Sequence, residues 1–175
     1  MNNQLLHPNT ARTMKVLTLV IVFFAGVAAM VLIAGQIGLL RWTAPTDLGV
    51  QQGRLKRPAL TPNSVSSQAA LYPDHPQLDY ARIEPFHFRG DGLLAIAKIA
   101  DILQGMDRTV LVTREPGYLY AQCSTQMLKF TDDIEFWLDT DAGVIQVRSA
   151  SRLGRKDFGV NRERIEMIRA QFAKN

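Results

Sequence analysis

An uninterrupted apolar run near the N-terminus constrains this chain more than any other feature. From Val16 to Leu40 the sequence reads VLTLVIVFFAGVAAMVLIAGQIGLL, in which no residue is charged and only Thr18 and Gln36 are polar. As a helix with a rise of about 1.5 Å per residue, the run would be roughly 37 Å long, and the hydrocarbon core of a bilayer is about 30 Å thick. The sequence therefore predicts one transmembrane helix over residues 16–40 that contacts membrane lipid.

Two other structures could contain such a run. A buried helix would need a large soluble protein around it, and the rest of this 175-residue chain is too small to enclose the run on every side. A cleaved signal peptide would have an apolar core of roughly 7–15 residues, followed by a small-residue cleavage site. This run is longer and no such site follows it, so the sequence favours an uncleaved signal anchor.

The orientation of the helix depends on more than the count of flanking charges. Two basic residues precede the run and four follow it: Arg12 and Lys15, then Arg41, Arg54, Lys56 and Arg57. Under the positive-inside rule, by which Lys and Arg near a transmembrane helix stay in the cytoplasm, this count favours a cytoplasmic C-terminal domain. However, three of the four later charges lie 14 or more residues beyond the run, at the edge of the range over which the rule applies. Long domains also translocate largely regardless of charge. We therefore expect a single-pass protein of the inner membrane with a periplasmic C-terminal domain.

The composition divides the chain into four parts. Residues 41–79 are rich in Pro, Ser, Asn and Gln, and their five prolines argue against a long helix or a central strand. We interpret this segment as a linker whose last part packs on the domain. The predicted parts are an N-terminal tail (1–15), the transmembrane helix (16–40), the linker (41–79) and a soluble domain (80–175).

Hydrophobic periodicity predicts an α+β domain. A strand over residues 82–88, interrupted by Pro85, precedes a helix over 92–104 with Asp91 as its N-cap. Strands over 109–113, 118–124, 134–138 and 144–149 follow, and Asn161 is predicted to cap a last helix. This order, β-α-β-β-β-β-α, indicates an antiparallel sheet with two helices on one face.

The register of the second hairpin follows from side-chain alternation. A four-residue loop over residues 140–143 would place Leu138 opposite Ile145, and a one-residue slip would set apolar faces against polar ones. The same register places Phe136 opposite Val147. It also places Glu135 opposite Arg148, which we predict to be a structural pair.

Motifs for common chemistries are absent from the sequence. A single cysteine excludes an intrachain disulfide framework, a zinc site made of thiolates and an iron–sulfur cluster. There is no P-loop, GxGxxG, GxSxG or HExxH motif, and His75 and His87 have no His or Cys at ligand spacing. We expect no metal and no cofactor. Cys123 is interpreted as a buried, inert thiol, with a redox sensor as the alternative.

Two charged clusters suggest partners. Five carboxylates between Asp132 and Asp141 could bind calcium, but solvated edge charge accounts for them as well. The stretch from Arg148 to Arg169 contains seven Lys and Arg residues but only three acidic residues. Because only one aromatic residue, Phe158, is interleaved with these basic residues, we expect no nucleic-acid partner. This basic C-terminal region could contact an anionic lipid headgroup or an acidic protein partner, or simply provide solubility.

Several blocks of sequence resemble one known family. Thr61 to Ala69 reads TPNSVSSQA, and the chain later contains YLYAQCST, FTDDIEFWLD, GVIQVRSASRLG and FGVNRERIEMIR. Through these blocks, residues 48–172 resemble the domain of unknown function 1499 family. Its members occur in bacteria and plastids, often behind a membrane or targeting segment, and no general activity is established for them. The family's two usual cysteines beside the PN pair are replaced here by residues such as Ala59 and Ser64, so the resemblance implies no disulfide. The family usually has Ser-Asp after the SRxGx motif, and this chain has Lys156-Asp157 there, so it lacks that serine hydroxyl.

The resemblance implies candidate site residues, but no catalytic ones. These are polar residues at strand ends and in loops, where binding sites gather: Asn63, Ser66, Ser67, Asp132, Asp133, Arg148, Ser149, Arg152, Asn161 and Arg162. They could equally satisfy buried backbone groups and one another. We expect a non-catalytic binding or scaffolding module of the cell envelope. The alternative is an enzyme of unknown class that acts on a polar substrate with Asp132, Asp133 and Arg152.

Overall fold

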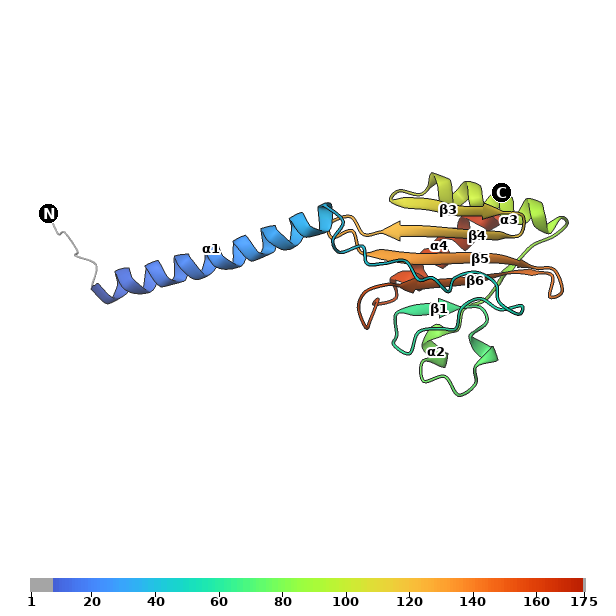
Figure 1. Ribbon diagram of the computed structural model, residues 1–175, viewed down its shortest axis with the longest axis horizontal. Helices are drawn as coiled ribbons and strands as arrows, with labels where there is room; N and C mark the ends of the chain where they lie inside the picture. The colour runs from blue at the N-terminus through green and yellow to red at the C-terminus, as the bar shows by residue number, and fades with distance from the viewer. Residues whose placement is uncertain (1–7, 175) are drawn as a thin grey trace.

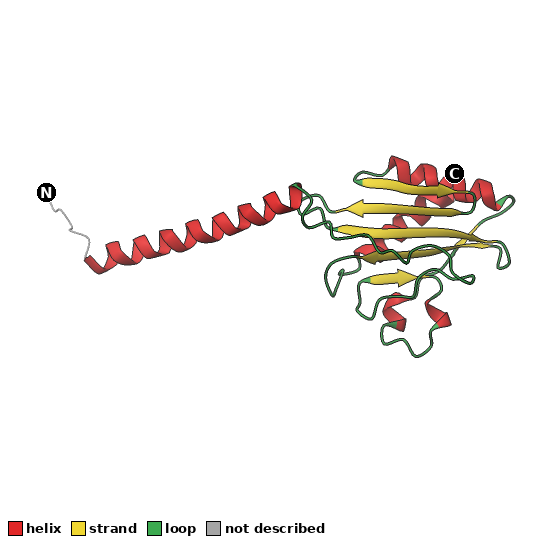
Figure 2. Ribbon diagram, viewed as in Figure 1, coloured by secondary structure: helices red, strands yellow, loops and turns green. Residues whose placement is uncertain are grey.

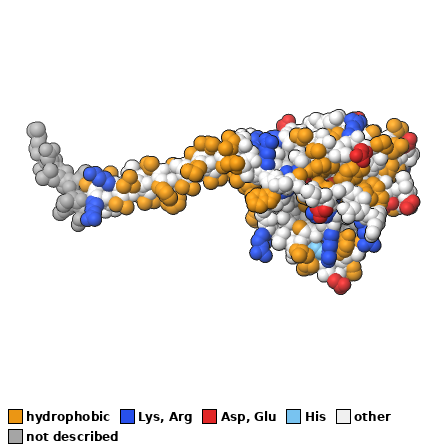
Figure 3. All heavy atoms as spheres, in the orientation of Figure 1, with side chains coloured by type: hydrophobic (Ala, Val, Ile, Leu, Met, Phe, Trp, Pro, Cys, Tyr) orange, Lys and Arg blue, Asp and Glu red, His pale blue; other side chains and the backbone are white. Residues whose placement is uncertain are grey.

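The computed structural model describes residues 8–174 and begins with a long helix that stands away from the rest of the protein (Figure 1). Helix α1 (Pro8–Gln36) carries exposed apolar side chains from Met14 to Ile33, and Lys and Arg side chains lie near both its ends (Figure 3). Its segment Thr10–Gln36 is long and apolar enough to cross a membrane. Residues 8–174 therefore contain one candidate membrane span.

Helix α1 ends four residues before the predicted end of the apolar run. Gly38 adopts φ 85°, and its N–H donates to the carbonyl of Gly35 at 3.0 Å. The N–H of Leu39 donates to the carbonyl of Ala34 at 2.9 Å. These two bonds form a Schellman motif with glycine at the left-handed position, which stops a helix although the sequence stays apolar.

The domain is an antiparallel sheet in the order β1-β6-β5-β4-β3, and β2 also pairs with β6. This arrangement confirms the α+β fold class. The bounds are β1 (Ser64–Ser66), β2 (Phe86–His87), β3 (Thr109–Glu115), β4 (Tyr118–Ser124), β5 (Thr131–Asp139) and β6 (Val144–Ser151). Strand β1 lies in the segment predicted as linker, and a 3-10 helix (Ala69–Leu71) and α2 (Leu78–Ala81) follow it. The strand predicted over residues 82–88 is reduced to β2, because Pro85 cannot donate to a strand ladder.

The predicted hairpin register is confirmed. Leu138 pairs with Ile145, Phe136 with Val147 and Glu135 with Arg148. In the other hairpin, β3 and β4 flank the Pro116-Gly117 turn, where Gly117 has φ 86°. A positive φ at this position suits a type II turn, and glycine adopts it without a steric penalty.

Two helices cover one face of the sheet (Figures 1 and 2). Helix α3 (Gly92–Gly105) is capped as predicted, because the Asp91 carboxylate accepts the N–H of Leu93 at 2.7 Å. The core lies between these helices and the sheet, with Ile99, Phe136 and Ile168 fully buried.

The prediction that Asn161 caps the last helix, α4 (Val160–Lys174), is wrong. The Asp157 carboxylate accepts the backbone N–H groups of Gly159 at 3.1 Å and Asn161 at 3.2 Å. Asn161 itself lies inside the first turn, with its side chain completely buried. Asn and Asp both suit a helix start, so local sequence alone did not distinguish between them.

The opposite face of the sheet is polar and lies under a loop. Residues 41–60, which we call the strap, run from the end of α1 across this face before the chain enters β1 (Figure 2). The N–H of Gly49 donates to Glu135 on β5 at 2.7 Å, and the N–H of Leu55 donates to Gln68 at 2.8 Å. The strap therefore packs on the domain and does not extend away from it.

Candidate binding groove on the polar face

Alternation along three strands gathers charged and phenolic side chains on the face under the strap. Strands β4 and β5 pair Tyr118 with Trp137 and Tyr120 with Glu135, and β6 sets Arg148 opposite Glu135. Residues two apart on a strand face the same side, so Asp133 joins Glu135 on this face. Asp133, Glu135 and Arg148 are all buried.

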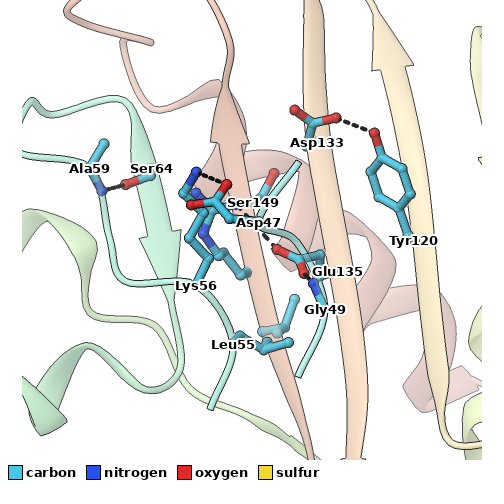
Figure 4. A network of polar contacts seen from close by, with 12 residues as sticks. Asp47, Gly49, Leu55, Lys56, Ala59, Ser64, Tyr120, Asp133, Glu135 and Ser149 are labelled. Carbon is cyan, nitrogen blue, oxygen red and sulfur yellow. Dashed lines mark hydrogen bonds and ion pairs between the residues drawn. The ribbon is translucent and has the colours of Figure 1, made fainter. Parts of the chain in front are cut away.

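The pair of Glu135 and Arg148 forms the centre of this face. An Oε atom of Glu135 lies 3.3 Å from Nη1 of Arg148, and the two side chains are 0% and 4% exposed. Glu135 also accepts the hydroxyl of Tyr118 at 2.9 Å. It accepts the N–H of Gly49 as well, as Figure 4 shows. Burial, followed by the negative charge of Glu135, raises the pKa of Tyr118, which therefore stays a neutral donor. The predicted structural pair is confirmed.

A second buried ion pair lies beside the first. Arg152 holds Asp133 with two hydrogen bonds, from Nε at 2.9 Å and from Nη2 at 2.6 Å. The hydroxyl of Tyr120 donates to the same carboxylate at 2.6 Å. Asp133 raises the pKa of Arg152, mainly through these hydrogen bonds, so the guanidinium remains charged. Nη1 of Arg152 reaches the carbonyl of Trp42 in the strap at 3.1 Å.

Between the strap and this face lies a groove of about 780 Å³ with an excess of positive charge. Five cationic residues line it: Arg54, Lys56, Arg57, Arg148 and Arg152. Only two acidic residues, Asp47 and Asp133, line the same groove. Asp47 is already paired with Lys56 at 2.5 Å, a contact that lowers the pKa of Asp47.

Three of the five cations have capacity left for a ligand. Arg54 and Arg57 are exposed and make no ion pair within residues 8–174, although the guanidinium of Arg57 lies 5.1 Å from the centre of the Tyr72 ring. Arg148 is buried, and its Nε is the one buried side-chain nitrogen or oxygen in this described range without a hydrogen-bond partner. An unpartnered buried donor costs about 1–3 kcal/mol, unless a bound group accepts from it.

A second polar cluster lies on the helix side of the sheet and is satisfied internally. The amide of Asn161 donates to the hydroxyl of Ser151 at 3.0 Å and to the carbonyl of Asn63 at 3.2 Å. The hydroxyl of Ser149 donates to the side-chain Oδ1 of Asn161 at 2.5 Å. The side-chain amide of Asn63 donates to the carbonyl of Gly154 at 2.7 Å. These contacts tie β1, β6 and α4 together, so the structure supports a scaffold role for these residues.

The remaining predicted site residues are dispersed. Asp132 and Asp133 are neighbours on β5 and therefore point to opposite faces, and Asp132 pairs with Arg164 of α4 at 2.6 Å. Ser66 accepts the N–H of Gln68, and Ser67 donates to Gln146 across the edge of the sheet. Arg162 donates to two backbone carbonyls, those of Tyr80 and Arg82. The structure does not bring Asp132, Asp133 and Arg152 into one site.

Most of the basic C-terminal region is engaged within the domain. Arg148, Arg152 and Arg164 are in ion pairs with strand carboxylates. Arg169 pairs with Glu166, and its guanidinium lies over the ring of Phe86 at 4.2 Å. The exposed basic residues that remain are Arg155 and Lys156, which have no ion pair within the described range.

Cys123 lies on the helix side of β4 and is 6% exposed. Burial raises the pKa of its thiol, which disfavours the reactive thiolate. Its Sγ lies 3.2 Å from the hydroxyl of Thr109. Within residues 8–174, no three His, Cys, Asp or Glu side chains are placed to hold a metal ion.

Sequence reasoning missed the strap as part of the groove. Arg54, Lys56 and Arg57 entered only the count of charges that flank the apolar run, because nothing local shows that the strap folds back over the sheet. Tyr118 and Tyr120 were also missed, although a signal for them exists. They alternate with the apolar residues Leu119 and Ala121 along β4, which places them on the opposite face of the sheet.

Comparison with known proteins adds a family but no activity. The family model described as protein of unknown function (DUF1499) matches residues 54–172, a range that begins within the strap and ends in α4. No curated protein and no solved structure matches the chain. Because the match covers well over half of the sequence and includes the groove's Arg54, Arg57, Arg148 and Arg152, the chain belongs to the DUF1499 family.

Proposed function

We propose that this protein is a single-pass, membrane-anchored binding module whose domain holds an oxyanion in the groove under the strap. One observation carries the proposal: the groove is lined by five cations, its two acids are already paired, and a buried Arg148 nitrogen has no partner. Guanidinium groups suit phosphate and carboxylate oxygens because they offer planar pairs of donors. A lipid phosphate is an oxyanion that a domain held at a membrane would meet.

The state of the acidic residues supports binding over catalysis. A general acid or base needs a carboxyl group that can reach a substrate and exchange a proton with it. The Asp133 oxygens are taken up by Arg152 and Tyr120, and the Glu135 oxygens by Arg148, Tyr118 and Gly49. The enzyme alternative would require these contacts to break during the reaction.

We place the anionic contact in the groove rather than in the basic C-terminal region. Charge-matched double variants separate the two surfaces: Arg54→Gln with Arg57→Gln in the groove, and Arg155→Gln with Lys156→Gln in the exposed loop. Each double variant removes two positive charges and leaves the buried ion pairs intact. The full chain in a non-ionic detergent would be titrated by calorimetry with inorganic phosphate, dihexanoylphosphatidylglycerol and dihexanoylphosphatidylcholine.

We expect the groove variant to bind its anionic ligand at least about tenfold more weakly, since hydrogen bonds to charged groups contribute about 1.5–3 kcal/mol. The loop variant should bind like the wild type, and added salt should weaken binding. If the wild type binds phosphatidylglycerol but not inorganic phosphate, the groove is a site for a lipid headgroup. If it binds inorganic phosphate as tightly as phosphatidylglycerol, the groove is a site for the free anion. Loss of binding in the loop variant only, or no binding of either anion by the wild type, would refute the groove.

The compartment is part of the same proposal. We propose that α1 is an uncleaved signal anchor in the inner membrane and that the domain lies in the periplasm, because long domains translocate largely regardless of flanking charge. A C-terminal fusion to a reporter that works only in the periplasm should be active, and a fusion to a cytoplasm-dependent reporter should be silent. The reverse pattern would overturn the orientation but leave the groove proposal untouched.

A further inference from the structure

The end of α1 packs directly against the loop between β4 and β5. The side-chain amide of Gln36 donates to the carbonyl of Met127 at 2.8 Å. Gly35 is buried against the same loop, and a Cβ at this position would lie 2.8 Å from the Leu128 carbonyl oxygen and 2.9 Å from its Cα. Only glycine allows the helix backbone to approach the loop backbone this closely.

A second contact holds the chain just after the helix. Arg152, which is fixed by Asp133, donates from Nη1 to the carbonyl of Trp42 at 3.1 Å and to that of Arg41 at 3.5 Å. The chain is therefore attached to the domain both within the last turn of α1 and just after it. In Figure 1 the β4–β5 loop lies beside the end of α1. This arrangement holds the loop level with the last turn of the helix.

Four large apolar side chains around this junction are exposed in the structure. Ile37 is 67% exposed, Leu39 68%, Trp42 64% and Met127 64%. Three of them follow directly from the last turn of α1, and Met127 is bonded to Gln36 in that turn. The candidate span of 27 residues is roughly 40 Å long, longer than the hydrocarbon core of about 30 Å, so its last turn falls near the boundary between acyl chains and headgroups.

We infer that Ile37, Leu39, Trp42 and Met127 form a collar that contacts lipid and seats the domain against the bilayer. The inference rests on the proposed anchoring by α1, and the occupant is the lipid that surrounds α1 because the collar continues the helix surface. Tryptophan suits this depth, where its ring is apolar and its N–H meets polar headgroups. The β4–β5 loop thus becomes a second membrane contact of the domain, beside the helix.

Site-directed spin labelling of the full chain in vesicles tests the collar. Single cysteines would be introduced by Met127→Cys in the loop, Val27→Cys within α1 and Leu60→Cys in the strap. Cys123 can remain because it is buried with a raised pKa, and labelled wild type provides the blank. In vesicles of phosphatidylcholine and phosphatidylglycerol, oxygen should collide with the labels at 127 and 27 more often than a water-soluble nickel chelate does. The label at 60 should show the reverse.

Two glycine variants provide a matched pair. Gly35→Ala places a Cβ against the Leu128 backbone, whereas Gly26→Ala meets nothing within 4 Å on the same helix. Added to Met127→Cys, Gly35→Ala should increase the accessibility of the label to nickel several-fold, and Gly26→Ala should leave it unchanged. An equal response to both variants would contradict the contact between the helix and the loop.

The three label positions separate failure of the collar from failure of the anchor. If the label at 127 collides mainly with nickel while the label at 27 collides mainly with oxygen, the collar is wrong and the anchor stands. If both collide mainly with nickel, the anchoring proposal fails and the collar fails with it. Oxygen preference at both 127 and 27, with nickel preference at 60, supports the collar.

Discussion

Replacing Glu135 by alanine is expected to lower the free energy of unfolding of the domain by about 3–5 kcal/mol. Glu135 is fully buried and provides the carboxylate that pairs with Arg148. Without it, a buried guanidinium loses its counter-charge, the Tyr118 hydroxyl loses its acceptor, and Gly49 of the strap loses its anchor. Removal of one partner costs more than the pair contributes, because the other charge stays buried.

Urea denaturation of the full chain in detergent, followed by tryptophan fluorescence, measures this loss. The control is Asp101→Ala, which breaks an exposed ion pair with Arg114 and should change stability by less than about 1 kcal/mol. The double variant Glu135→Leu with Arg148→Met should recover most of the loss, since it removes both buried charges. Similar effects of Glu135→Ala and Asp101→Ala would show that the buried pair does not have the predicted role.

Replacing Asp157 by asparagine is expected to cost roughly 2–3 kcal/mol, because hydrogen bonds to a charged acceptor contribute about 1.5–3 kcal/mol. The carboxylate accepts from the hydroxyl of Tyr80, from the N–H of Gly159 and from both nitrogens of Asn161. It therefore caps α4 and joins that helix to the segment before β2. An amide at this position keeps the shape but loses the charge that favours a helix N-terminus.

The same residue predicts how stability depends on pH. Burial raises the pKa of Asp157, but the hydrogen bonds from Tyr80, Gly159 and Asn161 together outweigh burial and hold the pKa below its ordinary value. A carboxyl with a depressed folded-state pKa binds more protons when unfolded, so its contribution is complete above the unfolded pKa of about 3.9 and is lost as the pH falls through the folded value.

Melting curves between about pH 7 and about pH 3 test this dependence. The wild type should lose melting temperature below about pH 4, and the curve of Asp157→Asn should lie lower at neutral pH and decline less in acid. The exposed Asp74→Asn is the control and should follow the wild type. A wild-type profile that is flat down to about pH 3, or parallel profiles for wild type and Asp157→Asn, would contradict the role assigned to this carboxylate.

Local patterns explain which elements were predictable. The register of the β5–β6 hairpin was predicted to the residue, because alternation has a period of two and a one-residue slip would move Phe136 out of the core. The strands themselves are longer than predicted, since β5 begins at Thr131 and β6 ends at Ser151. The cap at Asp91 was predicted for the same kind of local reason. The cap of α4 was not, because Asp157 and Asn161 both suit a helix start and only the packing of Asn161 against Ser149 and Asn63 decides between them.

The candidate site was less predictable than the fold. Asp133, Arg148 and Arg152 were named from the resemblance, but Asp132 was grouped with them although neighbouring strand residues point to opposite faces. The groove's other half comes from the strap, whose contacts join residues far apart in the chain. Gly49 and Glu135 are separated by 86 positions, and no local sequence pattern predicts a hydrogen bond between them.

The sequence by itself determined a helix apolar enough to span a membrane, an antiparallel sheet and the pairing of Glu135 with Arg148. Each of these follows from residue type and spacing within one element or one hairpin. Only the tertiary structure decided that the strap returns over the polar face and that Gly35 meets the β4–β5 loop. Both depend on hydrogen bonds and close contacts between distant segments, which form only after the sheet has placed their partners side by side.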